Sequence, residues 1–229
     1  MPPEIEPHTF WQEIHQPGTF AASGPFSGFY PAELADGRQI RLPIRPLPDG
    51  QHALASLIIN QASFAVVEAL AADLASRLSA FSPDVVVGLP TLGLTLAAAV
   101  ARHLGHSRYV PLGTSRKFWY DEGLSVPLSS ITTPDQVKRL YVDPRMLPLL
   151  KTRRVALVDD VISSGSSILA GLSLLRSIDV EPVAIGAAML QSDRWQSALE
   201  SCGVDWPKQV CGAFRTPRLM KIKDGNWSL

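Results

Sequence analysis

The sequence predicts an α/β fold in which a parallel β-sheet carries helices on both faces. Short apolar runs alternate with segments of helical periodicity between residues 64 and 203, and this alternation is typical of strands joined by crossover helices. The run at residues 155–158 is entirely apolar, as expected of a strand buried on both faces of a sheet. With 229 residues, of which 46% are hydrophobic, the chain can build one large domain with a substantial core.

The N-terminal segment precedes this pattern and differs from it in composition. Residues 1–28 are rich in proline and glycine, so little regular structure is expected there. A hairpin is predicted at residues 30–47, because the Asp-Gly pair at 36–37 is a strong turn signal between two short runs. Pro43, Pro46 and Pro48 should confine its second strand to a sheet edge.

The first strand–loop–helix unit of the predicted sheet follows a long helix. Helical periodicity begins at about residue 53 and continues to residue 81. A short buried strand is then expected at residues 85–87. The loop after it, residues 88–93, contains glycines that let backbone N–H groups approach an anion, and a second helix follows.

The middle of the chain is less regular. A strand is predicted at residues 108–112, and the polar segment after it shows no long period up to about residue 148. Loops of this length are usually functional lids or disordered. Residues 141–143 are expected to return as one strand of a hairpin, and a short helical turn should follow up to residue 150.

A sugar-phosphate pocket is predicted where the apolar run at 155–158 ends. Two acids come first, and after two apolar residues a turn of small residues leads into a helix. Such a turn offers N–H groups and a positive dipole end to an anion, and carboxylates suit sugar hydroxyls or hydrated Mg²⁺. The alternatives are an ordinary βα turn with an acidic end and the acidic pocket of a receiver-type domain. The residues concerned are Asp159, Asp160, Ser163, Ser164, Gly165, Ser166 and Ser167.

This segment resembles the phosphoribosyl-pyrophosphate (PRPP) signature of type I phosphoribosyltransferases. All positions from 155 to 167 fit that signature in character, although serine replaces the commoner threonine at Ser164 and Ser167. The resemblance implies that Asp159 and Asp160 are catalytic-site residues that hold the ribose 2- and 3-hydroxyls. It also implies that the loop at 163–167 binds the 5-phosphate.

Two further loops are assigned by the same resemblance. The family's pyrophosphate loop corresponds to Leu89, Pro90, Thr91, Leu92 and Gly93. Many relatives place arginine or lysine in this loop, whereas Thr91 and Leu92 are neutral, and a plain βα connection is the alternative interpretation.

The family's flexible loop corresponds to a segment that contains Arg116, Lys117 and Tyr120. Arg116 and Lys117 resemble an Arg-Lys pair of adenine-type members, and Lys117 would be the catalytic cation that neutralises the departing pyrophosphate. The alternative is a solvated charge pair near a hairpin.

The resemblance also implies an architecture and a reaction. Residues 1–50 would form a hood over the acceptor base, residues 51–204 the core with a flexible β-hairpin lid, and residues 205–229 a tail that is the second candidate for the hood. The reaction would transfer phosphoribose from PRPP to a nitrogenous base, with a purine favoured over orotate or another base. Mg²⁺ would bind mainly through PRPP, without an assigned protein ligand, and the protein would be a homodimer. A regulator that senses PRPP or a nucleotide without turnover is the alternative.

The amino-acid composition bears on possible partners, on membrane association and on the state of the cysteines. The chain has 21 basic and 21 acidic residues. It therefore lacks the basic excess that is typical of nucleic-acid-binding proteins. It also lacks the block of like charges that is typical of a segment binding a membrane surface. No apolar run approaches the length of a membrane-spanning helix. The spacing of Cys202 and Cys211 fits no zinc motif, and reduced thiols in a cytoplasmic protein are expected.

Overall fold

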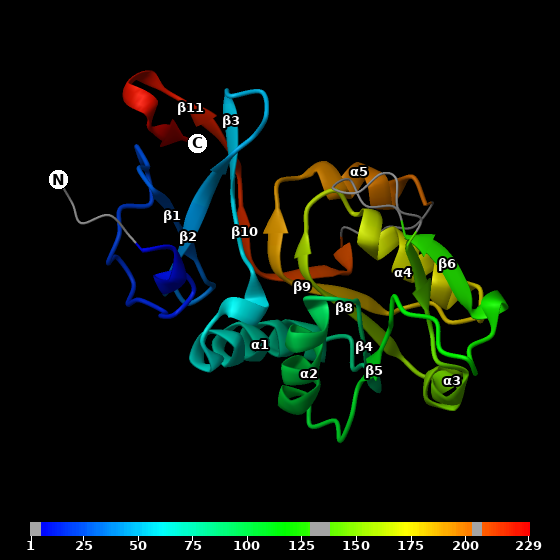
Figure 1. The fold of residues 1–229 in the computed structure, drawn as a ribbon. Coiled ribbons are helices and arrows are strands. Elements are labelled where there is room, and N and C mark those ends of the chain that lie inside the picture. The colour runs from blue at the N-terminus through cyan, green and yellow to red at the C-terminus, as the bar shows by residue number, and fades with distance from the viewer. Residues whose placement is uncertain (1–5, 129–137, 203–207) are drawn as a thin grey trace.

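A five-stranded parallel sheet forms the centre of the molecule (Figure 1). The computed structural model describes residues 6–128, 138–202 and 208–229. The strand order is β10-β9-β8-β4-β5, and all four neighbouring pairs are parallel. This confirms the predicted parallel sheet. Its strands are β4 (Val85–Gly88), β5 (Val110–Pro111), β8 (Val155–Ile162), β9 (Ala184–Gln191) and β10 (Val210–Thr216).

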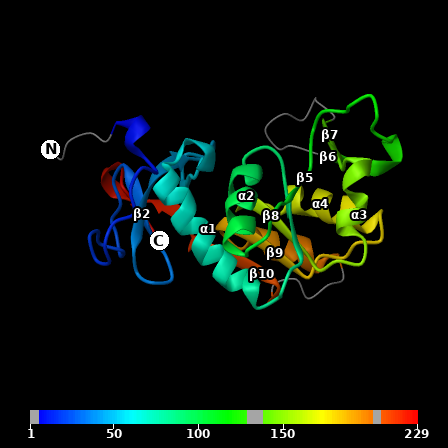
Figure 2. The ribbon, with the colours of Figure 1, turned by 90° about the horizontal axis from the view of Figure 1, so that it is seen from below.

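Helices cover both faces of this sheet, as predicted. Val86, Ala156 and Val158 pack in one cluster with α1 and α2, whereas Val155 and Leu157 pack in a second cluster with α3, α4 and α5. Successive strand residues point to opposite faces, so the apolar run of β8 serves both clusters. Figures 1 and 2 show α1 and α2 together on one side. The helices are α1 (Phe64–Ser79), α2 (Gly93–His103), α3 (Leu147–Leu150), α4 (Ser166–Arg176) and α5 (Arg194–Glu200).

Strand β8 is longer than its apolar run. Its pairing with β9 continues to Ile162, so Asp159 and Asp160 lie inside the strand rather than after it. A backbone ladder needs N–H and C=O groups but no apolar side chains, and this is why the end of the apolar run did not mark the end of the strand. The acids therefore have fixed backbone positions.

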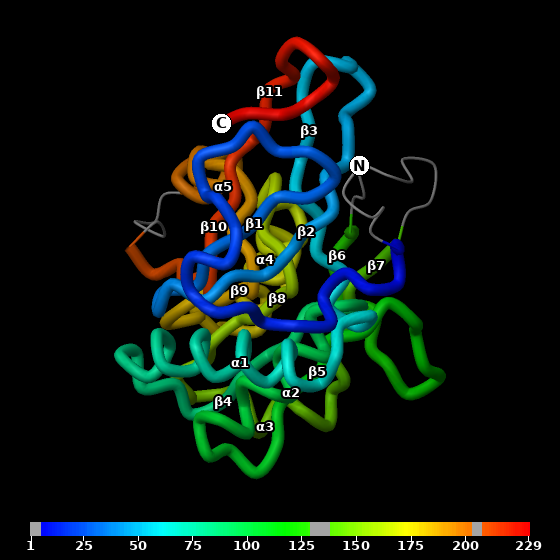
Figure 3. The backbone as a smooth tube through the Cα atoms, turned by 90° about the vertical axis from the view of Figure 1, so that its left-hand side faces the viewer, coloured from blue at the N-terminus to red at the C-terminus, as the bar shows by residue number. Residues whose placement is uncertain are grey.

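A second, antiparallel sheet is built from both ends of the chain. Its order is β1-β2-β3-β11-β12, and the C-terminal strand β11 lies beside β3 (Figure 3). The predicted hairpin at 30–47 is confirmed by the pairing of β1 with β2. The expectation that proline confines β2 to an edge is wrong: one half of β2 pairs with β1 and the other with β3, and Pro43 still accepts a hydrogen bond from the Ser56 N–H at 3.0 Å. The strands are β1 (Phe29–Glu33), β2 (Gln39–Pro46), β3 (His52–Ala55), β11 (Arg218–Lys221) and β12 (Trp227–Ser228).

The helix predicted from residue 53 begins eleven residues later, at Phe64. Ser63 caps it, because its Oγ accepts a hydrogen bond from the Val66 N–H at 3.2 Å. The residues that were expected to open the helix form β3 and a 3₁₀ turn at Ile59–Gln61 instead. Phe64, the first residue of α1, has 90% of its surface exposed.

The expected hairpin of the middle region is present, but its second strand, predicted at residues 141–143, lies at Lys138–Tyr141. Strand β5 is shorter than predicted, and β6 (Ser125–Leu128) pairs with β7 (Lys138–Tyr141) as a hairpin. Residues 129–137, which follow β6 in the sequence, lie outside the described residues, as does the expected core–tail boundary at 204–205. A turn at Pro144–Met146 leads into α3.

Both cysteines, Cys202 and Cys211, are free. Among the helices within the described ranges, none combines the length and the apolar character that crossing a membrane would require.

Candidate functional site

A small cavity lies between the end of β8 and the start of α4. It measures about 90 Å³ and is lined by Asp159, by residues 161–165 and by the first residues of α4, 166–168. Gly165 adopts a left-handed conformation with φ of +84°, which a residue with a side chain rarely tolerates. This turn sets the chain into α4 at Ser166, so the first N–H groups of the helix border the cavity. The loop predicted to bind phosphate is therefore open rather than filled by side chains.

The serines of this loop bring their hydroxyl groups together. Oγ of Ser164 lies 3.0 Å from Oγ of Ser166, and Ser163 and Ser167 line the same cavity. A hydroxyl can donate or accept, so these groups can turn their protons toward an anion. The cavity therefore has the donors and the small dimensions that a phosphate ester needs.

Asp159 and Asp160 face two different spaces. Asp159 lines the small cavity and is only 6% exposed, and its Oδ1 accepts a hydrogen bond from the Asp160 N–H at 2.9 Å. Asp160 is half-buried and lines a larger cavity under the antiparallel sheet. Burial raises the pKa of Asp159 well above its ordinary range, and the nearby Asp160 carboxylate raises it further. Burial also raises the pKa of Asp160, so hydroxyl donors or a cation would relieve an unfavourable charge here.

The loop at residues 89–93 reaches the same place from β4. The Leu89 N–H donates to the carbonyl oxygen of Val158 at 2.9 Å, and the Pro90–Thr91 peptide bond is cis. The first residue of α2, Gly93, lies directly against Asp159, since a Cβ built at Gly93 would be 2.7 Å from Oδ1 of that aspartate. The structure thus brings this loop and the acid pair together at the carboxyl edge of the sheet, where ligands collect in α/β folds. The loop itself carries no charged side chain.

A larger cavity of about 310 Å³ separates the two sheets. The Gln191 side-chain amide donates to the Ala55 carbonyl oxygen at 2.7 Å and ties β9 to β3 across one side of it. Sequence reasoning missed this cavity, although a glutamine at the end of an apolar strand was an available signal. Its lining residues are Arg45, Pro46, Leu47, Leu54, Ala55, Ser56, Leu57, Asp160, Val161, Met189 and Gln191.

The predicted lid residues lie outside these two cavities. Arg116 forms an ion pair with Glu122 at 2.7 Å, and the Tyr120 ring packs 5.9 Å from the ring of Tyr141. Lys117 is exposed. The structure does not place any of the three in the lining of either cavity.

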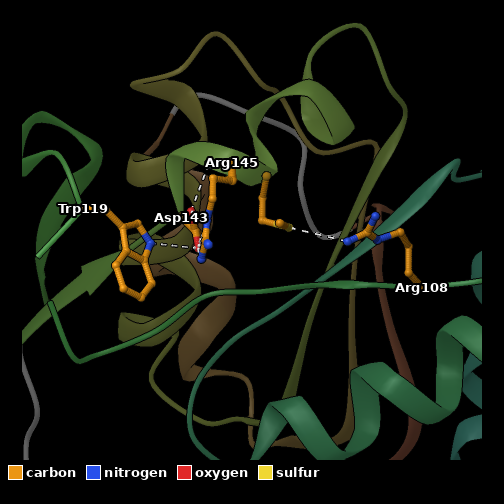
Figure 4. A network of polar contacts seen from close by, with 5 residues as sticks. Arg108, Trp119, Asp143 and Arg145 are labelled. Atoms are coloured by element: carbon orange, nitrogen blue, oxygen red, sulfur yellow. Dashed lines mark hydrogen bonds and ion pairs between the residues drawn. The ribbon is translucent and has the colours of Figure 1, made fainter. Parts of the chain in front are cut away.

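Trp119 anchors this segment next to α3 (Figure 4). Its ring centre lies 4.6 Å from the Arg145 guanidinium, and its indole N–H donates to Oδ2 of Asp143 at 3.4 Å. Hydrogen bonds from the Arg145 side chain lower the pKa of Asp143 to about 2, so the Asp143–Arg145 pair stays charged at neutral pH. Arg108 lies near the same turn, with its Nη2 4.0 Å from the sulfur of Met146.

No preformed metal centre accompanies the site. Across the ranges that the structure describes, no three histidine, cysteine or carboxylate side chains gather as metal ligands. The two acids of β8 fit a Mg²⁺ ion that brings its other oxygen ligands with it, because Mg²⁺ keeps several waters and commonly uses one or two carboxylates plus substrate phosphates.

Comparison with known proteins identifies a family model that covers most of the chain. The phosphoribosyl transferase domain model matches residues 54–208. None of the curated protein sequences matches.

Solved structures resemble the chain in fold. Adenine phosphoribosyltransferase from Thermoanaerobacter pseudethanolicus is 15% identical with a TM-score of 0.58, and the match covers 76% of this chain and 95% of that chain. The Giardia lamblia enzyme in complex with 9-deazaadenine is 19% identical with a TM-score of 0.60, and the match covers 76% and 93%. At these identities the likeness shows the fold alone.

Proposed function

The chain belongs to the phosphoribosyl transferase domain family and has its type I fold, and from this premise we propose that it transfers 5-phosphoribose from PRPP to a nitrogenous base. One observation carries the proposal: the serine-lined cavity, the acid pair and the loop at 89–93 meet at one edge of the sheet. We assign each of the three to one part of PRPP.

Each part of PRPP has a proposed place. The loop at 163–167 binds the 5-phosphate through N–H groups and hydroxyls, because its cavity is small and rich in donors. Asp159 and Asp160 accept hydrogen bonds from the ribose hydroxyls. The loop at 89–93 lies beside the acids and binds the pyrophosphate through its backbone. Mg²⁺ binds mainly through PRPP, and when bound it neutralises pyrophosphate charge.

The proposed reaction is a displacement at C1 of the ribose. A ring nitrogen of the base forms a bond to C1 while the bond from C1 to the pyrophosphate oxygen breaks, and pyrophosphate leaves with that electron pair. The proton displaced from the ring nitrogen passes to water. The protein contributes positioning, exclusion of water and charge stabilisation, with Lys117 on the lid acting on the pyrophosphate. No protein nucleophile is required.

The base is proposed to bind in the larger cavity, with the antiparallel sheet as the hood. This cavity adjoins Asp160, so a base there lies next to the ribose. The Arg116–Lys117 pair favours a purine, and the similar structures from Thermoanaerobacter pseudethanolicus and Giardia lamblia are adenine enzymes. A homodimer is the proposed assembly.

The alternative is a regulator that binds PRPP or a nucleotide without turnover. The neutral loop at 89–93 favours it, because pyrophosphate charge finds no basic side chain there. Pyrophosphate release from PRPP with a panel of bases, measured beside PRPP binding by calorimetry in the presence of Mg²⁺, separates the two functions. Release with any base supports the transferase. Binding without release supports the regulator, and absence of PRPP binding overturns both.

The ribose contact is tested by Asp160→Asn. The amide keeps the shape of the carboxylate but loses its charge and one acceptor, so the Kd for PRPP should rise about tenfold or more. The protein should stay folded, since Asp160 borders a cavity. Asp193→Asn, at an exposed carboxylate outside both cavities, is the matched control. An unchanged Kd for PRPP in Asp160→Asn contradicts the ribose role.

A further inference from the structure

The cavity proposed for the base contains one cation among its described lining residues, Arg45. Its only acid is Asp160, which the proposed function assigns to the ribose. The rest of the lining is apolar or uncharged, with Leu54, Leu57 and Met189 offering surfaces for a flat ring. A guanidinium is therefore the strongest feature by which this cavity can select a base.

Arg45 has neither an ion pair nor a side-chain hydrogen bond within the part of the chain that the structure describes. Six other arginines pair with carboxylates: Arg38, Arg77, Arg102, Arg116, Arg145 and Arg176. All five N–H donors of Arg45 are thus free to bind a ligand.

The fold fixes where this guanidinium is presented. Arg45 lies in β2 opposite Leu54 of β3, and the Gln191–Ala55 hydrogen bond joins β3 to β9. This bond occupies one of the two side-chain N–H donors of Gln191, and Arg45 is the one charged donor among the cavity's described lining residues. Because strands are more rigid than loops, the backbone from which the Arg45 side chain extends is held in place beside the cavity.

We propose that the acceptor base carries an anionic oxygen group, and that Arg45 binds this group and thereby determines specificity. The inference rests on the proposed function and names its substrate class. A planar guanidinium binds the two oxygens of an anionic group with paired hydrogen bonds that are stronger than bonds to a neutral ring nitrogen. Two sources share this chemistry: a carboxylated pyrimidine or pyridine ring, and an oxopurine that loses a ring N–H proton near neutral pH, so that negative charge spreads onto its exocyclic oxygen. Adenine has neither.

Product nucleotides that differ only in this group provide the test. Calorimetry compares orotidine 5′-monophosphate with uridine 5′-monophosphate, and xanthosine 5′-monophosphate with inosine 5′-monophosphate. In at least one pair, the wild-type protein should bind the nucleotide with the anionic base about tenfold to a hundredfold more tightly than the nucleotide with the neutral base. The pair that shows this preference identifies the source of the anionic oxygen.

Arg45→Met should abolish the preference by weakening the binding of only the nucleotide whose base is anionic. Arg41→Met is the matched control, because Arg41 lies four residues earlier in β2, over the Phe20 ring at 6.0 Å, outside the cavity lining. If circular dichroism shows that Arg45→Met is misfolded, Arg45→Gln is used in its place. Three outcomes overturn the inference: equal affinities within both pairs, a preference for the anionic base that persists when Arg45 is replaced, or no nucleotide binding at all.

Pyrophosphate release distinguishes this inference from the proposed function. Release with adenine that Arg45→Met leaves unchanged supports the transferase and overturns the role of Arg45. An Arg45-dependent preference for charged nucleotides without release on any base supports the role of Arg45 in binding and overturns the transferase.

Discussion

Gly93 and Asp159 are in direct contact, and the contact depends on the missing side chain of the glycine. A Cβ at Gly93 would lie 2.7 Å from Oδ1 and 2.9 Å from Cα of Asp159, closer than real Cβ atoms approach. The start of α2 is therefore seated on the strand that carries the acid pair. This close packing places the proposed pyrophosphate loop beside the proposed ribose site.

Gly93→Ala should separate these two parts of the site. The added methyl group must push α2 away from β8, which should cost about 1–3 kcal/mol in the free energy of unfolding and weaken PRPP binding. Gly113→Ala is the control, because a Cβ at Gly113 meets no atom within 4 Å. Denaturant melts and calorimetry measure the two effects. Wild-type stability and PRPP affinity in Gly93→Ala would contradict the close contact.

Filling the serine-lined cavity should block the 5-phosphate. Ser166→Val replaces a hydroxyl that borders this cavity with two methyl groups, so PRPP affinity should fall about tenfold or more. Ser173→Val makes the same change at an exposed position of the same helix and should leave the affinity unchanged. Inorganic phosphate titrated against PRPP binding reports on the cavity separately: it should compete in wild type. Equal PRPP affinity in both variants would exclude the cavity as the phosphate site.

Asp159 should make the protein less stable as pH rises. Its raised pKa, caused by burial and by Asp160, means that the folded protein binds this proton more tightly than the unfolded chain. The resulting stability is complete below the ordinary aspartate pKa of about 4 and is lost as the pH rises through the native pKa. Asp159→Asn mimics the protonated form and should raise the free energy of unfolding at pH 8 by about 1–3 kcal/mol.

The gain from Asp159→Asn should shrink as the pH is lowered toward 4, whereas Asp193→Asn should show no such trend. Thermal melts from about pH 4 to 8 measure the difference in stability between each variant and the wild type. A variant that is less stable than wild type at pH 8 would show that the Asp159 carboxylate is satisfied within the protein. The same variant should bind PRPP weakly, so stability and binding would change in opposite directions.

The parts of this fold that follow from local sequence were predictable, and those that depend on distant pairing were not. The unit from β8 to α4 was recognisable because an apolar run, two acids and a small-residue turn are contiguous. Residues 53–55 were assigned to a helix, because the four residues of β3 contain too little periodicity to reveal a strand that exists through its pairing with β2 and β11. Arg45 was overlooked for a similar reason, since only tertiary structure brings it to the cavity that Asp160 borders.

Replacing Lys117 tests whether the proposed lid takes part in the transfer reaction. The side chain is exposed and lies in the lining of neither cavity, so it should contribute little to PRPP binding before the lid closes. A cation that reaches the pyrophosphate as its charge develops stabilises the transition state more than the bound substrate. Lys117→Met should therefore lower kcat about tenfold to a hundredfold while the calorimetric Kd for PRPP stays near that of wild type. Lys151→Met, at an exposed lysine that ends α3, is the control. An unchanged kcat in Lys117→Met would show that Lys117 is only a solvated charge, whereas a matching loss of PRPP affinity would assign it to ground-state binding.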